Sequence, residues 1–118
     1  RNRLLMLSWA IYPALDPGTP AGLSGRIATR ELRRQVGFRG VSITDAMNAA
    51  AVSGLGGPGR LARRAARAGS DLLLFTSVGD ARTATGELVD ALRDGSLRRN
   101  RFRAAVRRTL RLRASLRD

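Results

Sequence analysis

The feature of this chain best suited to chemistry is a carboxylate that directly follows a short apolar segment. Asp45 directly follows the stretch 41–44, which is predicted as a β-strand, and a turn bracketed by Gly37 and Gly40 precedes that strand. Proteins of the α/β class place catalytic side chains where their parallel strands end. Asp45 is therefore a candidate catalytic group, and the alternative is that it caps a helix starting at Ala46. Local features favour the two interpretations about equally.

A catalytic Asp45 needs a partner, and the composition restricts which groups can serve. The chain has no histidine and no cysteine, which excludes a Ser-His triad, a thiolate metal site and a disulfide framework. Asp16 lies in a good turn sequence, and Asp71 precedes a predicted strand, where a role in stability is expected. We assign neither as the catalytic acid, and we expect no metal and no cofactor.

The elements that would position these residues alternate between strands and helices. Strands are predicted at residues 4–11, 41–44 and 71–76, the first one buried on both faces. Helices are predicted at residues 24–36, 60–68, 83–93 and from 96 to about 116, with Ser24 and Ser96 as caps and Gly37 and Gly69 as stops. This order predicts an α/β fold with three parallel strands and flanking helices.

Apolar spacing indicates which helix faces point inward, namely those of Ile27, Leu32 and Val36 and those of Phe102, Val106 and Leu110. Three parallel strands alone would leave two open sheet edges. We therefore expect the sheet to continue in another chain, or this chain to be one part of a larger barrel.

The formal charge of +13 suggests a polyanionic partner, because clustered cations bind phosphate backbones. All 22 basic residues are arginine, however, and an Ala, Gly and Arg-rich composition fits a GC-rich coding sequence equally well. The five aromatic residues are scattered, so no stacking platform is evident and we expect no nucleic-acid partner. No apolar run approaches the roughly 20 residues that span a bilayer.

Several separated blocks resemble glycoside hydrolase family 3, in particular its beta-N-acetylhexosaminidase branch. They are residues 6–16 (MLSWAIYPALD), 30–48 (RELRRQVGFRGVSITDAMN), 68–74 (AGSDLLL) and 94–97 (DGSL), followed by the helix around 107–112 (RRTLRL). The blocks occur in the family's order and cover nearly the whole chain.

The resemblance implies roles for individual residues. Asp45 matches the strand-end nucleophile of a retaining mechanism, in which a second group protonates the leaving oxygen and later activates water. Ala46 stands where family members of the beta-glucosidase type tend to carry tryptophan, so the hexosaminidase branch is favoured and the beta-glucosidase type is the alternative. Trp9 is a candidate substrate-binding residue, because an aromatic face packs well against a sugar ring, although core or rim packing is the commoner role.

The resemblance also implies a fold, the (β/α)8 barrel of TIM type, of which this chain would be the C-terminal portion. We interpret residues 1–118 as a single partial domain, the last three βα units plus a closing helix. The family's acid/base histidine lies on an earlier loop that this chain lacks. The expected function is hydrolysis of terminal beta-N-acetylhexosamine from cell-wall-derived glycans, with a missing N-terminal half of the barrel as partner.

A non-catalytic remnant whose arginine-rich surface binds polyanions is the alternative to an enzyme. Such a remnant would concentrate its charge on one face. Location stays open between the cytoplasm and export, because any export signal would precede residue 1.

Overall fold

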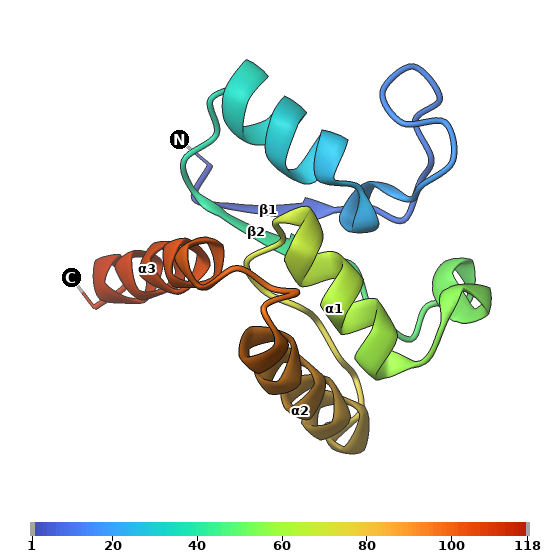
Figure 1. Ribbon diagram of the computed structural model, residues 1–118. Helices are drawn as coiled ribbons and strands as arrows, with labels where there is room; N and C mark the ends of the chain where they lie inside the picture. The colour runs from blue at the N-terminus through green and yellow to red at the C-terminus, as the bar shows by residue number, and fades with distance from the viewer. Residues whose placement is uncertain (1, 118) are drawn as a thin grey trace.

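The computed structural model describes residues 2–117 and has an α/β architecture in which helices surround a small parallel sheet (Figure 1). The strands are β1 (Leu4–Leu7) and β2 (Val41–Thr44). The helices are the short 3₁₀ segments η1 (Ala21–Leu23) and η3 (Ala50–Leu55), the π-helix η2 (Arg26–Gln35), and the α-helices α1 (Pro58–Ala68), α2 (Val78–Asp94) and α3 (Arg99–Ser115).

The sheet has two parallel strands rather than the three predicted. β1 pairs with β2 in the register Leu4 to Val41 through Leu7 to Thr44. The predicted third strand, residues 71–76, meets β2 only through a parallel bridge between Ile43 and Leu72. Side chains of β2 take over part of the pairing there, so the segment lies beside β2 without a regular ladder. The α/β class is confirmed, and the three-stranded sheet is not.

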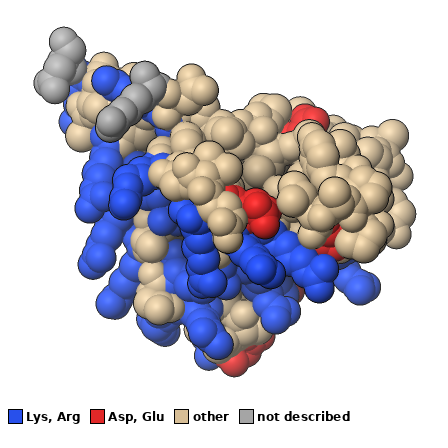
Figure 2. Space-filling model, turned by 90° about the horizontal axis from the view of Figure 1, so that it is seen from above, with Lys and Arg blue, Asp and Glu red and all other residues tan. Residues whose placement is uncertain are grey.

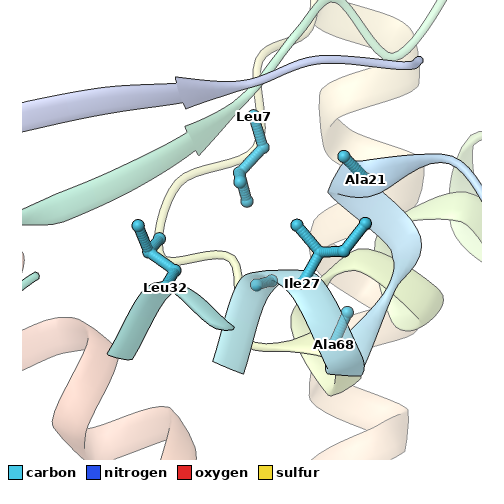
Figure 3. Close-up of a cluster of buried hydrophobic side chains, with 6 residues drawn as sticks. Leu7, Ala21, Ile27, Leu32 and Ala68 are labelled. Carbon is cyan, nitrogen blue, oxygen red and sulfur yellow. The ribbon is translucent and has the colours of Figure 1, made fainter. Parts of the chain in front are cut away.

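The first hydrophobic cluster lies between β1 and η2 (Figure 3). Leu7 points from the strand toward Ile27 and Leu32 of the helix, and each of these side chains is less than 9% exposed. Leu4 and Met6 alternate with this inward set and are 48% and 53% exposed. The prediction that residues 4–11 form one strand buried on both faces is therefore wrong: the strand is shorter, and one of its faces is uncovered.

Helix η2 begins close to the predicted position because a serine hydroxyl accepts a hydrogen bond from one of the backbone N–H groups at its start, which have no partner within the helix. Ser24 Oγ accepts a hydrogen bond from the Ile27 N–H at 3.2 Å. At the other end the Val36 N–H bonds to the Glu31 carbonyl, five residues back, which is the π-helical spacing. The wider turn rotates the Val36 side chain away from the core. This side chain is 74% exposed, so its predicted inward position is wrong. Gly37 then ends the helix with φ +76°.

The second cluster lies beyond the carboxyl ends of the strands. Its buried side chains are those of Trp9, Leu23, Met47, Val52, Leu61 and Ala65. Partly buried side chains of η3 and of the 71–75 segment pack against them. Helix α1 supplies Leu61 and Ala65 and ends at Gly69, as predicted, with φ +109°. Helix α2 starts at Val78, five residues before the predicted start, because Ser77 Oγ accepts a hydrogen bond from the Asp80 N–H.

Helix α3 corrects two further expectations. Ser96 does not cap it, since Arg98 occupies the cap position and the Ser96 hydroxyl accepts a hydrogen bond from Arg63 instead. The predicted inward face is only partly covered: Phe102 is partly buried, whereas Val106 and Leu110 are 40% and 54% exposed. None of the described residues of α3 is fully buried. The helix is attached to the body mainly by polar side chains.

Candidate active site

Asp45 directly follows β2. Because β1 and β2 are parallel, the carboxyl end of β1 lies beside it. Its backbone N–H donates to the Leu7 carbonyl at 3.0 Å, which extends the parallel pairing by one residue beyond Thr44. Its carboxylate Oδ1 accepts a hydrogen bond from the Ala46 N–H at 2.7 Å. The side chain is partly buried, with one oxygen fixed by the backbone.

The helix-capping alternative for Asp45 is not what the structure shows. The chain makes a turn after Asp45, and the next helical segment, η3, begins only at Ala50 with Ala49 as its cap residue. A carboxylate bonded to the next residue's N–H caps no helix. The position of Asp45 is thus the strand-end position in which α/β proteins place catalytic side chains.

Thr44, directly before Asp45, helps to hold this edge together. Its side chain is fully buried, and its Oγ1 accepts a hydrogen bond from the Leu74 N–H at 3.1 Å. The Thr44 N–H donates in turn to the Leu72 carbonyl. The hydroxyl therefore replaces a ladder bond and ties the 71–75 segment to the strand that carries Asp45. The sequence alone gave no sign of this role.

Trp9 lies close to the same edge and is 7% exposed. Its indole Nε1–H donates a 2.8 Å hydrogen bond to the carbonyl of Ala46, the residue whose N–H binds the Asp45 carboxylate. The ring packs in the second hydrophobic cluster and lies so close to Gly22 that a Cβ there would be 2.6 Å from it. Trp9 thus holds the backbone of Ala46 on its carbonyl side, one peptide unit beyond the N–H that binds Asp45, and its predicted contact with substrate stays a prediction.

Asp71 lies at the opposite end of the strands, at the start of the 71–75 segment. Its side chain is fully buried and binds Arg33 of η2 at 2.6 Å and Arg108 of α3 at 2.7 Å. It also accepts a hydrogen bond from the Ser42 N–H at 3.0 Å. A carboxylate occupied by two guanidinium groups and a backbone N–H is a structural group. The two arginines could not have been singled out among 22 from the sequence.

The remaining polar groups act locally. Asp16 accepts a 2.7 Å hydrogen bond from Ser24 Oγ, the hydroxyl that binds the Ile27 N–H in the first turn of η2; the cap position itself is occupied by Gly25 and not by Ser24 as predicted. Burial lowers the pKa of the Arg33 guanidinium, and the neighbouring Asp71 carboxylate opposes that shift. Among residues 2–117 no three carboxylates gather in a way that could hold a metal ion. In the same range no helix is both long and apolar enough to cross a membrane.

Two parallel strands joined through helices, with a carboxylate fixed at the carboxyl end of one strand, define an α/β domain. The family model for the glycosyl hydrolase family 3 N-terminal domain matches residues 2–112. The chain belongs to glycosyl hydrolase family 3.

Individual relatives agree with this assignment. An uncharacterized secreted glycosyl hydrolase of Arthroderma benhamiae is 39% identical over 96% of this chain and 33% of its own length. A beta-hexosaminidase of Neisseria gonorrhoeae is 36% identical over 77% of this chain and 23% of its own. A family 3 beta-N-acetylglucosaminidase from Paenibacillus sp. superimposes with a TM-score of 0.90 and 30% identity, covering 95% of this chain and 22% of that one. The chain thus spans a third or less of these proteins.

Proposed function

We propose that this chain supplies the nucleophile half of a glycoside hydrolase site that removes terminal beta-N-acetylhexosamine residues with retention of configuration. The observation that carries the proposal is Asp45, a carboxylate fixed at the carboxyl end of β2 by the Ala46 N–H. The similarity to beta-hexosaminidases supports the choice of sugar. A cell-wall glycan is the expected source of the substrate.

The chemistry assigned to this chain is the formation of the covalent intermediate. The free oxygen of the Asp45 carboxylate attacks the anomeric carbon as the bond to the leaving oxygen breaks, and the leaving oxygen takes a proton from a separate acid. Water then attacks the same carbon, activated by that second group, and the carboxylate leaves. The hydrogen bond from the Ala46 N–H holds Oδ1 of the carboxylate in place. The other oxygen, Oδ2, is the one that attacks.

The second group belongs, in this proposal, to a part of the barrel outside this chain. The two carboxylates nearest to a strand, Asp16 and Asp71, are occupied by Ser24 and by two arginines. The chain spans only 33% of the Arthroderma relative and 22% of the Paenibacillus structure, which leaves ample room for such a part. We infer that residues 1–118 correspond to the last three βα units and the closing helix of the complete barrel.

The experiment joins this chain to the N-terminal barrel segment of a family 3 hexosaminidase and assays an aryl N-acetyl-β-glucosaminide. We expect the 118-residue chain alone to be inactive and the fusion to be active. Asp45→Ala should lower kcat of the fusion by at least about 1,000-fold, roughly 4 kcal/mol in transition-state energy. Asp90→Ala, which changes an exposed carboxylate of α2, is the matched control and should keep full activity.

A second experiment distinguishes a nucleophilic carboxylate from a structural one. Azide can enter the space vacated in Asp45→Ala, attack the anomeric carbon once, and give a glycosyl azide of inverted configuration. Fusion activity that survives Asp45→Ala, or an azide product of retained configuration, would contradict the assigned role. Faster hydrolysis of an aryl β-glucoside than of the N-acetylglucosaminide would favour the beta-glucosidase type instead.

A further inference from the structure

A groove with strongly basic walls lies on the helical side of the molecule, between α1, the beginning of α3 and the turn before η2. Its volume is about 470 Å³, and it is lined by Leu23, Gly25, Arg64, Arg67, Ala68, Ser96, Leu97, Arg98 and Arg101. Four of these nine residues are arginine and none is acidic. Leu23 also belongs to the second hydrophobic cluster, but none of the nine residues is Asp45 or a hydrogen-bond partner of its carboxylate. The groove is thus a separate feature from the candidate active site.

The charge of this groove is not compensated by the neighbouring side chains. Within residues 2–117, Arg64, Arg67 and Arg98 make no hydrogen bond or ion pair through their side chains. Arg101 donates only to the neutral Thr29 hydroxyl, at 3.0 Å. By contrast, Arg63, the residue directly before Arg64 in α1, binds both Glu87 and Asp94. Three guanidinium groups therefore keep their donors available for a ligand.

One carboxylate adjoins the groove, that of Asp94, which accepts a hydrogen bond from the Ser96 N–H and is paired with Arg63; basic side chains otherwise predominate on the surface. Figure 2 shows basic side chains crowded over one part of the molecular surface, with a large area beside it almost free of them. Arginines of η2, α1 and α3 contribute to the excess that gives the chain its charge of +13. A basic surface surrounding a groove raises the local concentration of anions and guides them to it. The uneven distribution agrees with a polyanion-binding surface.

The residue types point to phosphate as the group that is bound. The planar guanidinium fork matches the geometry of phosphate oxygens and can donate two parallel hydrogen bonds to them. No aromatic side chain lines the groove, so it has no platform on which a nucleic-acid base could stack. The groove is larger than one phosphate group, so more than one phosphate can lie in it at once.

We propose that this groove binds a linear polymer carrying one phosphate per repeat unit, and that it contacts the phosphates and not the groups between them. With about four phosphate contacts, the affinity falls with salt on a logarithmic slope of roughly −3. The proposal goes beyond glycoside hydrolysis and does not depend on it. Binding is therefore measured with the 118-residue chain, whether or not that chain has any activity.

The test uses fluorescence anisotropy of an end-labelled inorganic polyphosphate titrated with the chain over a range of salt concentrations. The groove variant replaces three arginines that lack partners, Arg64→Gln, Arg67→Gln and Arg98→Gln. The control variant removes the same charge from exposed arginines outside the groove, Arg34→Gln, Arg82→Gln and Arg93→Gln. Circular dichroism shows whether both variants keep the fold of the parent chain.

We expect the groove variant to lose at least 10-fold in affinity and to reduce the salt slope by about 2, and the control variant to lose less than 3-fold. A mixed-sequence oligonucleotide of equal charge should compete with polyphosphate, because it offers the same phosphates. Equal losses in both variants would overturn the proposal in favour of diffuse charge. So would equally tight binding of polyglutamate, or oligonucleotide binding without polyphosphate binding, since these would show carboxylate binding or recognition of bases.

Discussion

At the scale of single residues, two aspartates at opposite ends of β2 are used in opposite ways: Asp45 follows its carboxyl end, and Asp71 lies beside its amino end, bonded to the Ser42 N–H. Among residues 2–117 the Asp45 carboxylate accepts a hydrogen bond only from the next backbone N–H, whereas the Asp71 carboxylate is enclosed by Arg33 and Arg108. A carboxylate that attacks carbon must keep an oxygen free, while one that fixes helices to a sheet must be fully bonded. The hydrogen-bond partners thus separate the candidate nucleophile from the structural carboxylate.

Replacement of Asp71 by asparagine should destabilise the fold strongly. The change leaves Arg33 and Arg108 facing each other without the negative charge between them, and both guanidinium groups are mostly buried. We expect the free energy of unfolding in urea to fall by about 2–4 kcal/mol. Asp90→Asn, at an exposed site on α2, should change it by less than about 0.5 kcal/mol. Equal stability of the two variants would show that the buried cluster contributes no net stability.

The close contact between Gly22 and Trp9 gives a second prediction at this scale. An added methyl group in Gly22→Ala would lie 2.6 Å from the indole ring, so the ring must shift within a packed cluster. We expect a loss of about 1–3 kcal/mol in unfolding free energy and a change in fluorescence of Trp9, the single tryptophan. Gly18→Ala is the matched control, since nothing lies within 4 Å of its added Cβ. Unchanged fluorescence in Gly22→Ala would contradict the tight packing.

At the scale of elements, the helices were largely predictable from local signals, and the third strand was not. Glycines 37, 69 and 95 end helices because each adopts a positive φ. A glycine after a helical pattern of residues is a signal that can be read from the sequence. The 71–75 segment has the apolar run of a strand, yet the hydroxyls of Ser42 and Thr44 take over some of its backbone bonds. Such side-chain substitution depends on tertiary placement, which no local pattern encodes.

The same limit applies to the site and to helix faces. The strand-end position of Asp45 followed from the apolar run before it, whereas the hydrogen bond from Trp9 to the Ala46 carbonyl joins residues 37 positions apart. The spacing of Phe102, Val106 and Leu110 correctly indicated an apolar stripe on α3. It could not reveal that no described part of the chain fully covers this stripe.

The contact between α1 and α2 leads to a prediction about pH. Hydrogen bonds from Ser96 and then from Arg63 lower the pKa of Asp94 from 3.8 to about 2. Because the folded state favours the charged form, this contribution to stability is present above pH 3.8 and is lost as the pH falls toward 2. NMR titration of the Asp94 carboxyl carbon should place its midpoint near pH 2, and Ser96→Ala should move it upward. A midpoint near pH 3.8 in the parent chain would contradict the hydrogen-bonded arrangement.

At the scale of the whole molecule, β1 is the open boundary of the chain. Within the described residues it pairs on one side only, with β2, while Leu4 and Met6 are about half exposed. This chain covers 33%, 23% and 22% of the three relatives described above, and a closed barrel, the fold that the resemblance to the family implies, has no open sheet edge. The uncovered strand is therefore where the proposed remainder of the barrel would join.

This boundary can be tested by amide hydrogen exchange. The Val41 N–H bonds to the Arg3 carbonyl and the Asp45 N–H to the Leu7 carbonyl, so the odd-numbered residues of β1 direct their backbone groups toward β2. By the alternation of a parallel strand, the N–H groups of Leu4 and Met6 point toward the open edge. In the 118-residue chain these two amides should exchange at least 10-fold faster than those of Leu5 and Leu7. In the fusion with an N-terminal barrel segment they should become equally protected, because an added strand would accept their hydrogen bonds. Protection of Leu4 and Met6 already in the 118-residue chain at low concentration would show that the edge is not open, and the proposed junction would have to lie elsewhere.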